Sequence, residues 1–183
     1  MPDILQIVLA SLTAAAAISD LRSRTISNGL VLTGLMLGFA LNIYLFGWNG
    51  FWRALSGFGL ASAVYLPLFA LRAMGGGDVK FMAAIGSITG AGNWFVIFLI
   101  TSILGGIVAI LLLLIRRNLS NTLRNVGHIL TELAQFRPPH LSAPELSVDH
   151  PQAVSLPHGA VIAGGSFLFL VVLRFGLIQQ TGY

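Results

Sequence analysis

The stretch Phe81–Ile115 runs for 35 residues without a charged side chain. A helix that crosses a lipid bilayer needs about 20 mostly apolar residues, so this stretch has the length and composition of membrane-embedded structure. The rest of the chain agrees, because 56% of its 183 residues are hydrophobic and only 9% are charged, whereas a soluble domain carries about 25% charged residues. The sequence predicts an all-α integral membrane protein with a single domain over residues 1–183.

The apolar segments predict six membrane helices, separated where glycine and polar residues interrupt them. The expected helices cover Ile4–Ser19 (extended by Leu21), Gly29–Phe46, Ala54–Leu71, Val79–Thr89, Trp94–Ile115 and His158–Ile178. Turns are expected at Gly47–Gly50 and at Gly90–Asn93. The fourth helix is too short to cross the hydrocarbon, and non-helical backbone at membrane depth is tolerated only inside protein or beside a water-filled cavity. The glycines before this helix therefore suggest a backbone that enters a wet cavity.

The basic residues predict how the chain is oriented in the membrane, because Lys and Arg accumulate on the cytoplasmic side. With the N-terminus outside, Arg53 and Arg174 lie outside and eight basic residues lie inside. The eight are Arg22, Arg24, Arg72, Lys80, Arg116, Arg117, Arg124 and Arg137. The net charge of +4 is then expected to set topology rather than to bind nucleic acid.

A single polar stretch, Asn118–Leu156, interrupts the apolar pattern. Its first part carries apolar residues at helical spacing, which predicts an amphipathic helix in the inner membrane interface. These residues are Leu119, Leu123, Val126, Leu130 and Leu133. With the prolines that follow, residues from about 116 to 156 are expected to form a cytoplasmic loop.

Two aspartates lie at the predicted cytoplasmic ends of apolar segments. An Asp at a helix centre in a membrane costs about 2.5–3.5 kcal/mol, so an acid at that depth is a functional-site candidate. Asp20 and Asp78 are two of only six acidic residues. Two carboxylates that share a site cannot both ionise easily, so the pair holds one proton. One member can then activate a water while the other polarises a carbonyl, which is aspartic peptidase chemistry.

This chemistry needs no metal, thiol or cofactor, and the chain contains no cysteine. His128, His140 and His150 are expected to be solvated loop residues rather than metal ligands. Gly75, Gly76 and Gly77 precede Asp78 and permit another chain to approach the backbone closely. A peptide laid beside this turn could hydrogen-bond to its backbone groups.

Three short motifs resemble those of a known family. Asp20-x-Arg22-x-x-x-Ile26-x-Asn28 and Gly75-x-Gly77-Asp78-x-Lys80 are similar to the two aspartate motifs of the type IV prepilin peptidases, which are membrane GxGD aspartic peptidases. Leu156-Pro157-His158-Gly159-Ala160 is similar to the Pro-x-Gly segment of that family. The resemblance extends from residue 20 to about residue 160. Ser27 stands where the family usually has proline, which affects only the local turn.

The resemblance implies cleavage of the basic leader of prepilin-like membrane proteins at the cytoplasmic face of the bacterial inner membrane. It implies catalytic roles for Asp20 and Asp78, and substrate-binding or supporting roles for a further set of residues. That set is Gly75, Gly76, Gly77, Lys80, Arg22, Asn28, Pro157 and Gly159. Without cysteines or an N-terminal Cys-rich domain, the chain resembles the short, peptidase-only members of tight-adherence (Flp) pilus systems, and no methylating activity is expected.

Other interpretations of the same residues remain open. Asp20 could be a topology-setting acid, Asp78 a helix N-cap, and Arg22 an anchor at the membrane surface. The substrate could be another precursor such as preflagellin. From a different class, the chain could be a small proton-coupled transporter with the two aspartates as proton relays, although such proteins often show repeats that are not seen here. The sequence does not predict an oligomeric state.

Overall fold

The computed structural model describes residues 1–71, 74–116 and 158–176, and all secondary structure in these ranges is helical. The helices are α1 (Asp3–Ser23), α2 (Asn28–Ala70), α3 (Gly76–Arg116) and α6 (His158–Arg174). Three of them contain segments long and apolar enough to cross a membrane, namely Asp3–Ser23, Asn28–Ala70 and Gly76–Leu112, and His158–Arg174 is a shorter apolar helix. The predicted all-α class is confirmed. The amphipathic segment at 119–133 lies outside the described residues, so the cytoplasmic loop stays a prediction.

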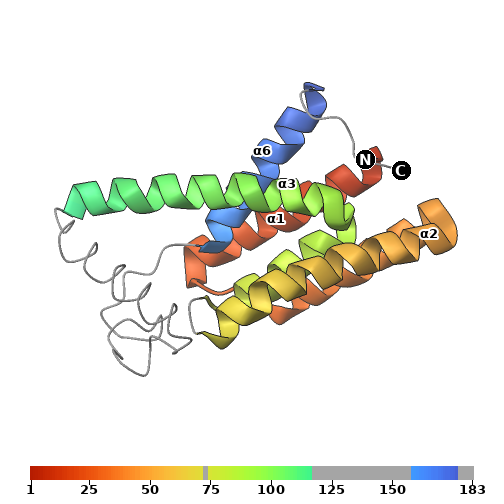
Figure 1. Cartoon of the computed structure of the whole chain (residues 1–183), viewed down its shortest axis with the longest axis horizontal. Coiled ribbons are helices and arrows are strands. Elements are labelled where there is room, and N and C mark those ends of the chain that lie inside the picture. Colours follow the sequence, from red (N-terminus) through yellow and green to blue (C-terminus); the bar gives the residue numbers. More distant parts are fainter. Residues whose placement is uncertain (72–73, 117–157, 177–183) are drawn as a thin grey trace.

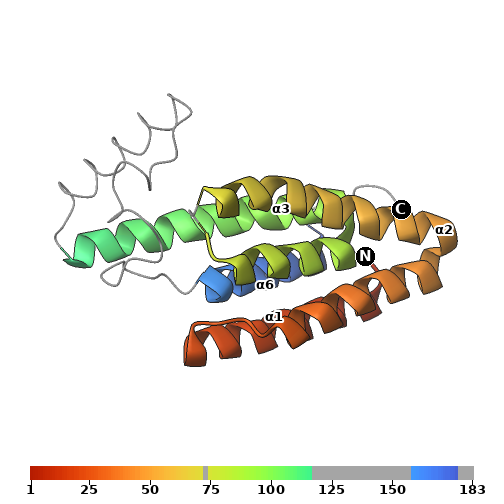
Figure 2. The same cartoon turned by 90° about the horizontal axis from the view of Figure 1, so that it is seen from below.

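The two longest helices reverse direction at glycines. Gly47 (φ 59°, ψ −135°) interrupts α2 and Gly90 (φ 78°, ψ 166°) interrupts α3. A positive φ is readily adopted only by glycine. In α2 the reversal brings Gly50 against the backbone carbonyl of Asn42, two residues that would lie about 12 Å apart along a continuous helix. Figures 1 and 2 show both helices folding back at the same end of the bundle. The predicted breaks in these regions are confirmed, while the count of six membrane crossings stays a prediction.

The first part of α3, from Gly76 to the break at Gly90, lies in the middle of the bundle. Its residues 81–90 are all buried, including Phe81, Met82, Ile85 and Ile88, which are fully enclosed. A helix that is apolar on every side is stable only when it is surrounded. The short helix expected after the glycines is therefore the core around which α1, α2 and the rest of α3 pack.

Small residues let α2 approach this central segment closely. The backbones of Gly57 and Gly86 touch, and Gly38 faces the side chain of Ser87. Close contact between helices through small residues is a common way of packing in membranes, where lipid is as apolar as the side chains. Asn42 adds a polar link, because its Nδ2 lies 3.0 Å from the carbonyl oxygen of Ser87 and 3.2 Å from that of Ile88.

The start of α3 differs from the sequence-based expectation. The helix begins at Gly76 rather than at Val79, and among the described residues the only glycines with positive φ are Gly47, Gly90 and Gly176. Gly75, Gly76 and Gly77 therefore do not form a turn that only glycine can adopt. Asp78 is the third residue of the helix, in its first turn, so its interpretation as the N-cap residue is wrong by three positions.

Candidate active site

Asp20 and Asp78 meet at the end of the bundle opposite the two reversals. Asp20 lies one turn before the end of α1, where its side chain is 6% exposed, and Asp78 lies in the first turn of α3. The Asp78 carboxyl group is close enough to interact electrostatically with both Asp20 and His158. Figures 1 and 2 show the end of α1, the start of α3 and the start of α6 at one end of the molecule. Three segments far apart in sequence thus form one site.

Helix α6 holds the Asp20 carboxylate in place. The backbone N–H of Ala160 donates to Oδ2 of Asp20 across 3.0 Å. Since the first N–H groups of a helix have no partner within the helix, the start of α6 provides a free donor at this point. The bond satisfies a buried carboxylate oxygen and fixes the orientation of the side chain.

Gly159 allows this approach. A Cβ atom at Gly159 would lie 3.0 Å from Cγ of Asp20 and 3.0 Å from Cδ1 of Ile26, closer than side chains normally pack. Ile26 also faces Gly77, where a Cβ would lie 3.9 Å from that of Ile26. Ile26 therefore lies between the start of α6 and the start of α3. The glycine of the Pro-x-Gly motif contacts the first aspartate motif directly.

The two aspartate motifs are also joined at the surface. Nζ of Lys80 donates to Oδ1 of Asn28 across 3.1 Å, which links the beginning of α3 to the beginning of α2. Ser27, which stands where the resembling family has proline, is the N-cap of α2 and accepts from the N–H of Leu30 at 3.2 Å. Its capping role explains how serine replaces proline here.

The remaining predicted site residues lie around the pair in different ways. Gly75 is exposed and faces the Asp78 carboxylate, 3.6 Å from where its Cβ would be. Gly76 packs against the ring of Phe69. Arg22 is exposed in the last turn of α1, where the structure shows no contact with Asp20, and Pro157 lies outside the described residues. Gly75 and Gly159 thus face the aspartates, Gly76 and Gly77 pack against neighbouring apolar side chains, and Arg22 does not contact Asp20.

Sequence reasoning missed Tyr65. This residue of α2 is 3% exposed and interacts electrostatically with Asp78, while its ring packs edge-on against Trp94 and Phe98. A buried tyrosine carries an apolar ring and one polar group that needs a partner. The tyrosine in the apolar stretch after Arg53 was the available signal, but only the fold shows that it interacts with the second aspartate.

The described part of the chain contains no group of three or more His, Cys, Asp or Glu side chains that could together hold a metal ion. At this end of the bundle Asp78 interacts electrostatically with Asp20, with His158 and with the Tyr65 hydroxyl.

Fold and site define a helical membrane protein with two aspartates, from separate helices, gathered at one end of the bundle. The model of the type IV leader peptidase family matches residues 7–110, a range that contains both aspartates, and the chain belongs to this family. It is therefore a membrane peptidase, and the resemblance seen in its motifs is confirmed. No curated protein and no solved structure matches the chain. The family match ends before α6, so the contact from Ala160 to Asp20 comes from the structure alone.

Proposed function

We propose that the protein is an aspartic endopeptidase that removes the basic leader from type IV prepilin-like precursors. The observation that carries this proposal is the meeting of Asp20 and Asp78, 58 positions apart (78 − 20) in sequence, closely enough to interact electrostatically. Membership of a leader peptidase family favours this function over proton-coupled transport, in which the same aspartates would serve as proton relays.

In the proposed reaction the two carboxyl groups share one proton. The ionised member takes a proton from a water molecule as the water oxygen attacks the scissile carbonyl carbon, while the protonated member donates a hydrogen bond to the carbonyl oxygen. The tetrahedral intermediate then breaks its C–N bond as a proton passes to the leaving nitrogen. The proton belongs to the pair, so neither aspartate alone is assigned as acid or base.

The position of the pair suits a substrate whose cleavage site lies at the membrane surface. Asp20 and Asp78 lie in the terminal turns of α1 and α3, at an end rich in basic residues, which we place on the cytoplasmic side of the inner membrane. The apolar segment of a precursor would lie beside the helices of the enzyme, and its leader would extend into the cytoplasm. Lys80 and Asn28 would then support the entrance to the site.

Substitution of each aspartate tests the mechanism. The Asp20→Asn and Asp78→Asn variants of the purified protein are expected to lose at least about a thousandfold in turnover of a prepilin substrate, because neither step above proceeds without both carboxyl groups. Asp3→Asn is the matched control, since Asp3 is an exposed aspartate in the first turn of α1, and it should keep turnover within about twofold. Near-normal cleavage by either Asp20→Asn or Asp78→Asn would show that the dyad mechanism is wrong.

The identity of the substrate is tested separately. Candidate precursors, including prepilins and preflagellins, are incubated with the wild-type protein, and the new N-terminus of each product is sequenced. Cleavage directly before the apolar segment of a prepilin, with no cleavage of preflagellin, is the expected result. The opposite preference would keep the chemistry and reassign the substrate.

A further inference from the structure

The proposed reaction leaves one polar group near the aspartates without a role, the hydroxyl of Tyr65. The residue is 3% exposed, and the structure shows no hydrogen bond between its hydroxyl and any other residue that it describes. A tyrosine in such a position normally finds a hydrogen-bond partner. Whether the substrate can supply that partner depends on where the hydroxyl lies relative to the aspartates.

The packing of α2 on α3 places Tyr65 opposite Asp78. After its reversal, α2 runs antiparallel to the first part of α3 (Figure 2), and the two backbones touch at Gly57 and Gly86. Tyr65 is eight residues after Gly57, and Asp78 is eight residues before Gly86, so each lies about 12 Å from that contact along its own helix. Residues eight apart belong to one stripe of a helix. Tyr65 and Asp78 are therefore at the same level, on the stripes along which the two helices meet.

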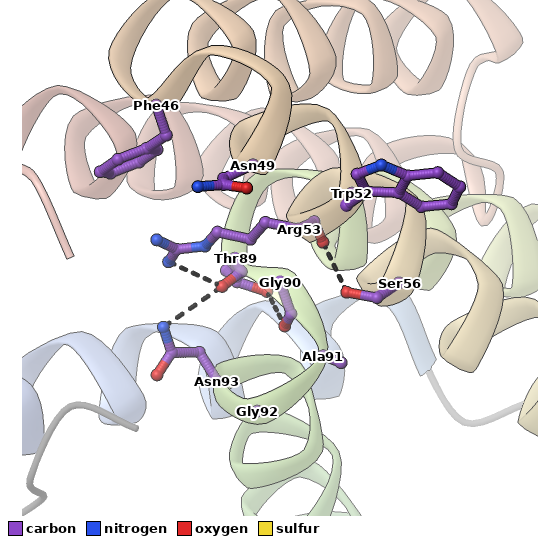
Figure 3. A pocket seen from close by; sticks show the side chains of 10 residues that line it. All are labelled: Phe46, Asn49, Trp52, Arg53, Ser56, Thr89, Gly90, Ala91, Gly92 and Asn93. Atoms are coloured by element: carbon purple, nitrogen blue, oxygen red, sulfur yellow. Dashed lines mark hydrogen bonds between the residues drawn. The ribbon is translucent and has the colours of Figure 1, made fainter. Parts of the chain in front are cut away.

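Contacts at both ends of this pair of helices keep the same register. At the reversals, Nη2 of Arg53 donates to the carbonyl oxygen of Thr89 at 3.1 Å, beside the pocket shown in Figure 3. At the aspartate end, the ring of Phe69 lies 3.3 Å from where a Cβ of Gly76 would be. The level of Tyr65 is thus fixed from both sides.

Aromatic neighbours from the second part of α3 hold the ring of Tyr65. The ring meets those of Trp94 and Phe98 edge-on, with 6.1 Å and 6.0 Å between ring centres. Trp94 is itself anchored, because its Nε1 donates to the carbonyl oxygen of Met82 at 3.1 Å, one turn after Asp78. The ring therefore has a defined place beside the start of α3, and its hydroxyl interacts electrostatically with the Asp78 carboxyl group.

A fixed phenolic hydroxyl suits the oxygen atom that gains charge during amide hydrolysis. The carbonyl oxygen becomes negative as the tetrahedral intermediate forms, and preorganised donors directed at it give large rate effects. A carbonyl oxygen has two lone pairs, so it can accept from the protonated aspartate and from a second donor together. A tyrosine hydroxyl is protonated at neutral pH and can act as that donor without a base.

We propose that Tyr65 is a further catalytic residue, whose hydroxyl donates a hydrogen bond to the oxygen of the tetrahedral intermediate. The tyrosine keeps its proton, and no bond to it forms or breaks. The protons that move are those of the attacking water and of the aspartate pair. This inference rests on the proposed function, because it requires peptide hydrolysis by the aspartate pair, but it does not depend on which precursor is cleaved.

Kinetics of the purified Tyr65→Phe variant test the proposal. The change removes the hydroxyl oxygen and keeps a ring that can pack against Trp94 and Phe98. We expect kcat to fall by at least about thirtyfold while KM stays within about twofold, because the lost bond is made only in the transition state. Tyr44→Phe is the matched control, since Tyr44 belongs to the same helix and is 85% exposed, and its kcat should not change. Normal kcat in Tyr65→Phe would overturn the proposal.

Two inhibitors separate a bond to the substrate from a structural effect. Both are precursor peptides altered at the scissile amide. In one the amide is replaced by a difluoroketone, whose hydrate carries the oxygen of the intermediate, and in the other by a reduced amide, which lacks it. Tyr65→Phe should weaken binding of the difluoroketone by at least about tenfold and of the reduced amide by less than about twofold.

The same pair of inhibitors gives the result that would contradict this role. An equal loss for both would show that Tyr65 acts through the fold or through Asp78 rather than on the substrate oxygen. Because binding of the reduced amide reports on the integrity of the site in the same preparation, a partly unfolded variant does not reproduce the expected result.

Failure of this role is distinguishable from failure of the aspartate mechanism. The assay uses a precursor that the wild-type protein cleaves. If Asp20→Asn cleaves it as fast as the wild type, the aspartate mechanism is wrong, and the role of Tyr65 is wrong with it. If Asp20→Asn is inactive and Tyr65→Phe keeps full kcat, only the role of Tyr65 is wrong.

Discussion

The backbone N–H of Ala160 donates a hydrogen bond to the carboxylate of Asp20, 140 positions earlier in the chain. The donor is at the start of α6 and the acceptor near the end of α1. The orientation of the first aspartate therefore depends on the last helix that the structure describes, and the site is a property of the assembled bundle rather than of either aspartate motif.

Adding a methyl group at Gly159 should impair this site. A Cβ would lie 3.0 Å from Cγ of Asp20, so Gly159→Ala forces α6 or the carboxylate to move and strains the bond from Ala160. We expect kcat for prepilin cleavage to fall by at least about tenfold with a smaller change in KM, because a small misplacement of a catalytic group has a large effect on rate.

Gly164 provides the matched control in the same helix. A Cβ at Gly164 meets nothing within 4 Å, so Gly164→Ala should keep kcat within about twofold and slightly favour the helix. Equal activities of the Gly159→Ala and Gly164→Ala variants would contradict the role assigned to the close contact.

The contact between Gly57 and Gly86 makes a prediction about stability. A Cβ at Gly57 would meet the backbone of Gly86, and overpacking of this kind costs about 1–3 kcal/mol. Gly57→Ala should therefore lower the midpoint of thermal unfolding of the purified protein. Gly59→Ala, in the same helix with open space around its Cβ, should leave the midpoint unchanged or raise it; if both variants unfold alike, the close helix packing is not what stabilises the core.

The bond between Lys80 and Asn28 is expected to couple the two motifs weakly. It joins exposed side chains, so each of Lys80→Met and Asn28→Ala should change the free energy of unfolding by about 0.5–1.5 kcal/mol at most. In a double-mutant cycle on kcat/KM, the effects of the two changes should be less than additive, since either one removes the same bond. Strict additivity would mean that the bond plays no part in catalysis.

A pair that shares one proton predicts a bell-shaped pH profile. Activity requires one protonated and one ionised carboxyl group, so kcat/KM should fall both when the second proton is added and when the shared proton is lost. The measurement is kcat/KM for a prepilin substrate between about pH 4 and pH 9. A profile that rises to a plateau with a single ionisation would indicate that only one carboxyl group acts.

Local sequence signals predicted much of the fold. Uncharged stretches located the helices, and the glycines at 47 and 90 marked the places where two of them reverse, because a positive φ is a local property of glycine. The short helix after Gly77 was expected, but its place in the buried centre of the bundle was not. The predicted start of that helix, Val79, lies three residues after the observed start, Gly76. Glycines at the beginning of a helix carry little information about where regular helical geometry begins.

Contacts between distant residues were much harder to predict. The pairing of Asp20 with Asp78 was anticipated from the cost of acids in a membrane and from the motifs. The bond from Ala160, the proximity of Tyr65 to Asp78 and the enclosure of Arg53 all depend on how helices pack, which periodicity within one helix does not encode. Arg53 in particular was expected only as a basic residue at the outer surface.

The hydrogen bond from Ala160 also has a consequence for the timing of biosynthesis. Both aspartates leave the ribosome well before residue 160 does, and they cannot reach their final arrangement until α6 has been made and has packed against α1. In a chain whose translation stops before α6 is made, the Asp20 carboxylate lacks the hydrogen bond from Ala160. Newly made enzyme should therefore gain activity only after α6 has entered the bilayer and packed against α1.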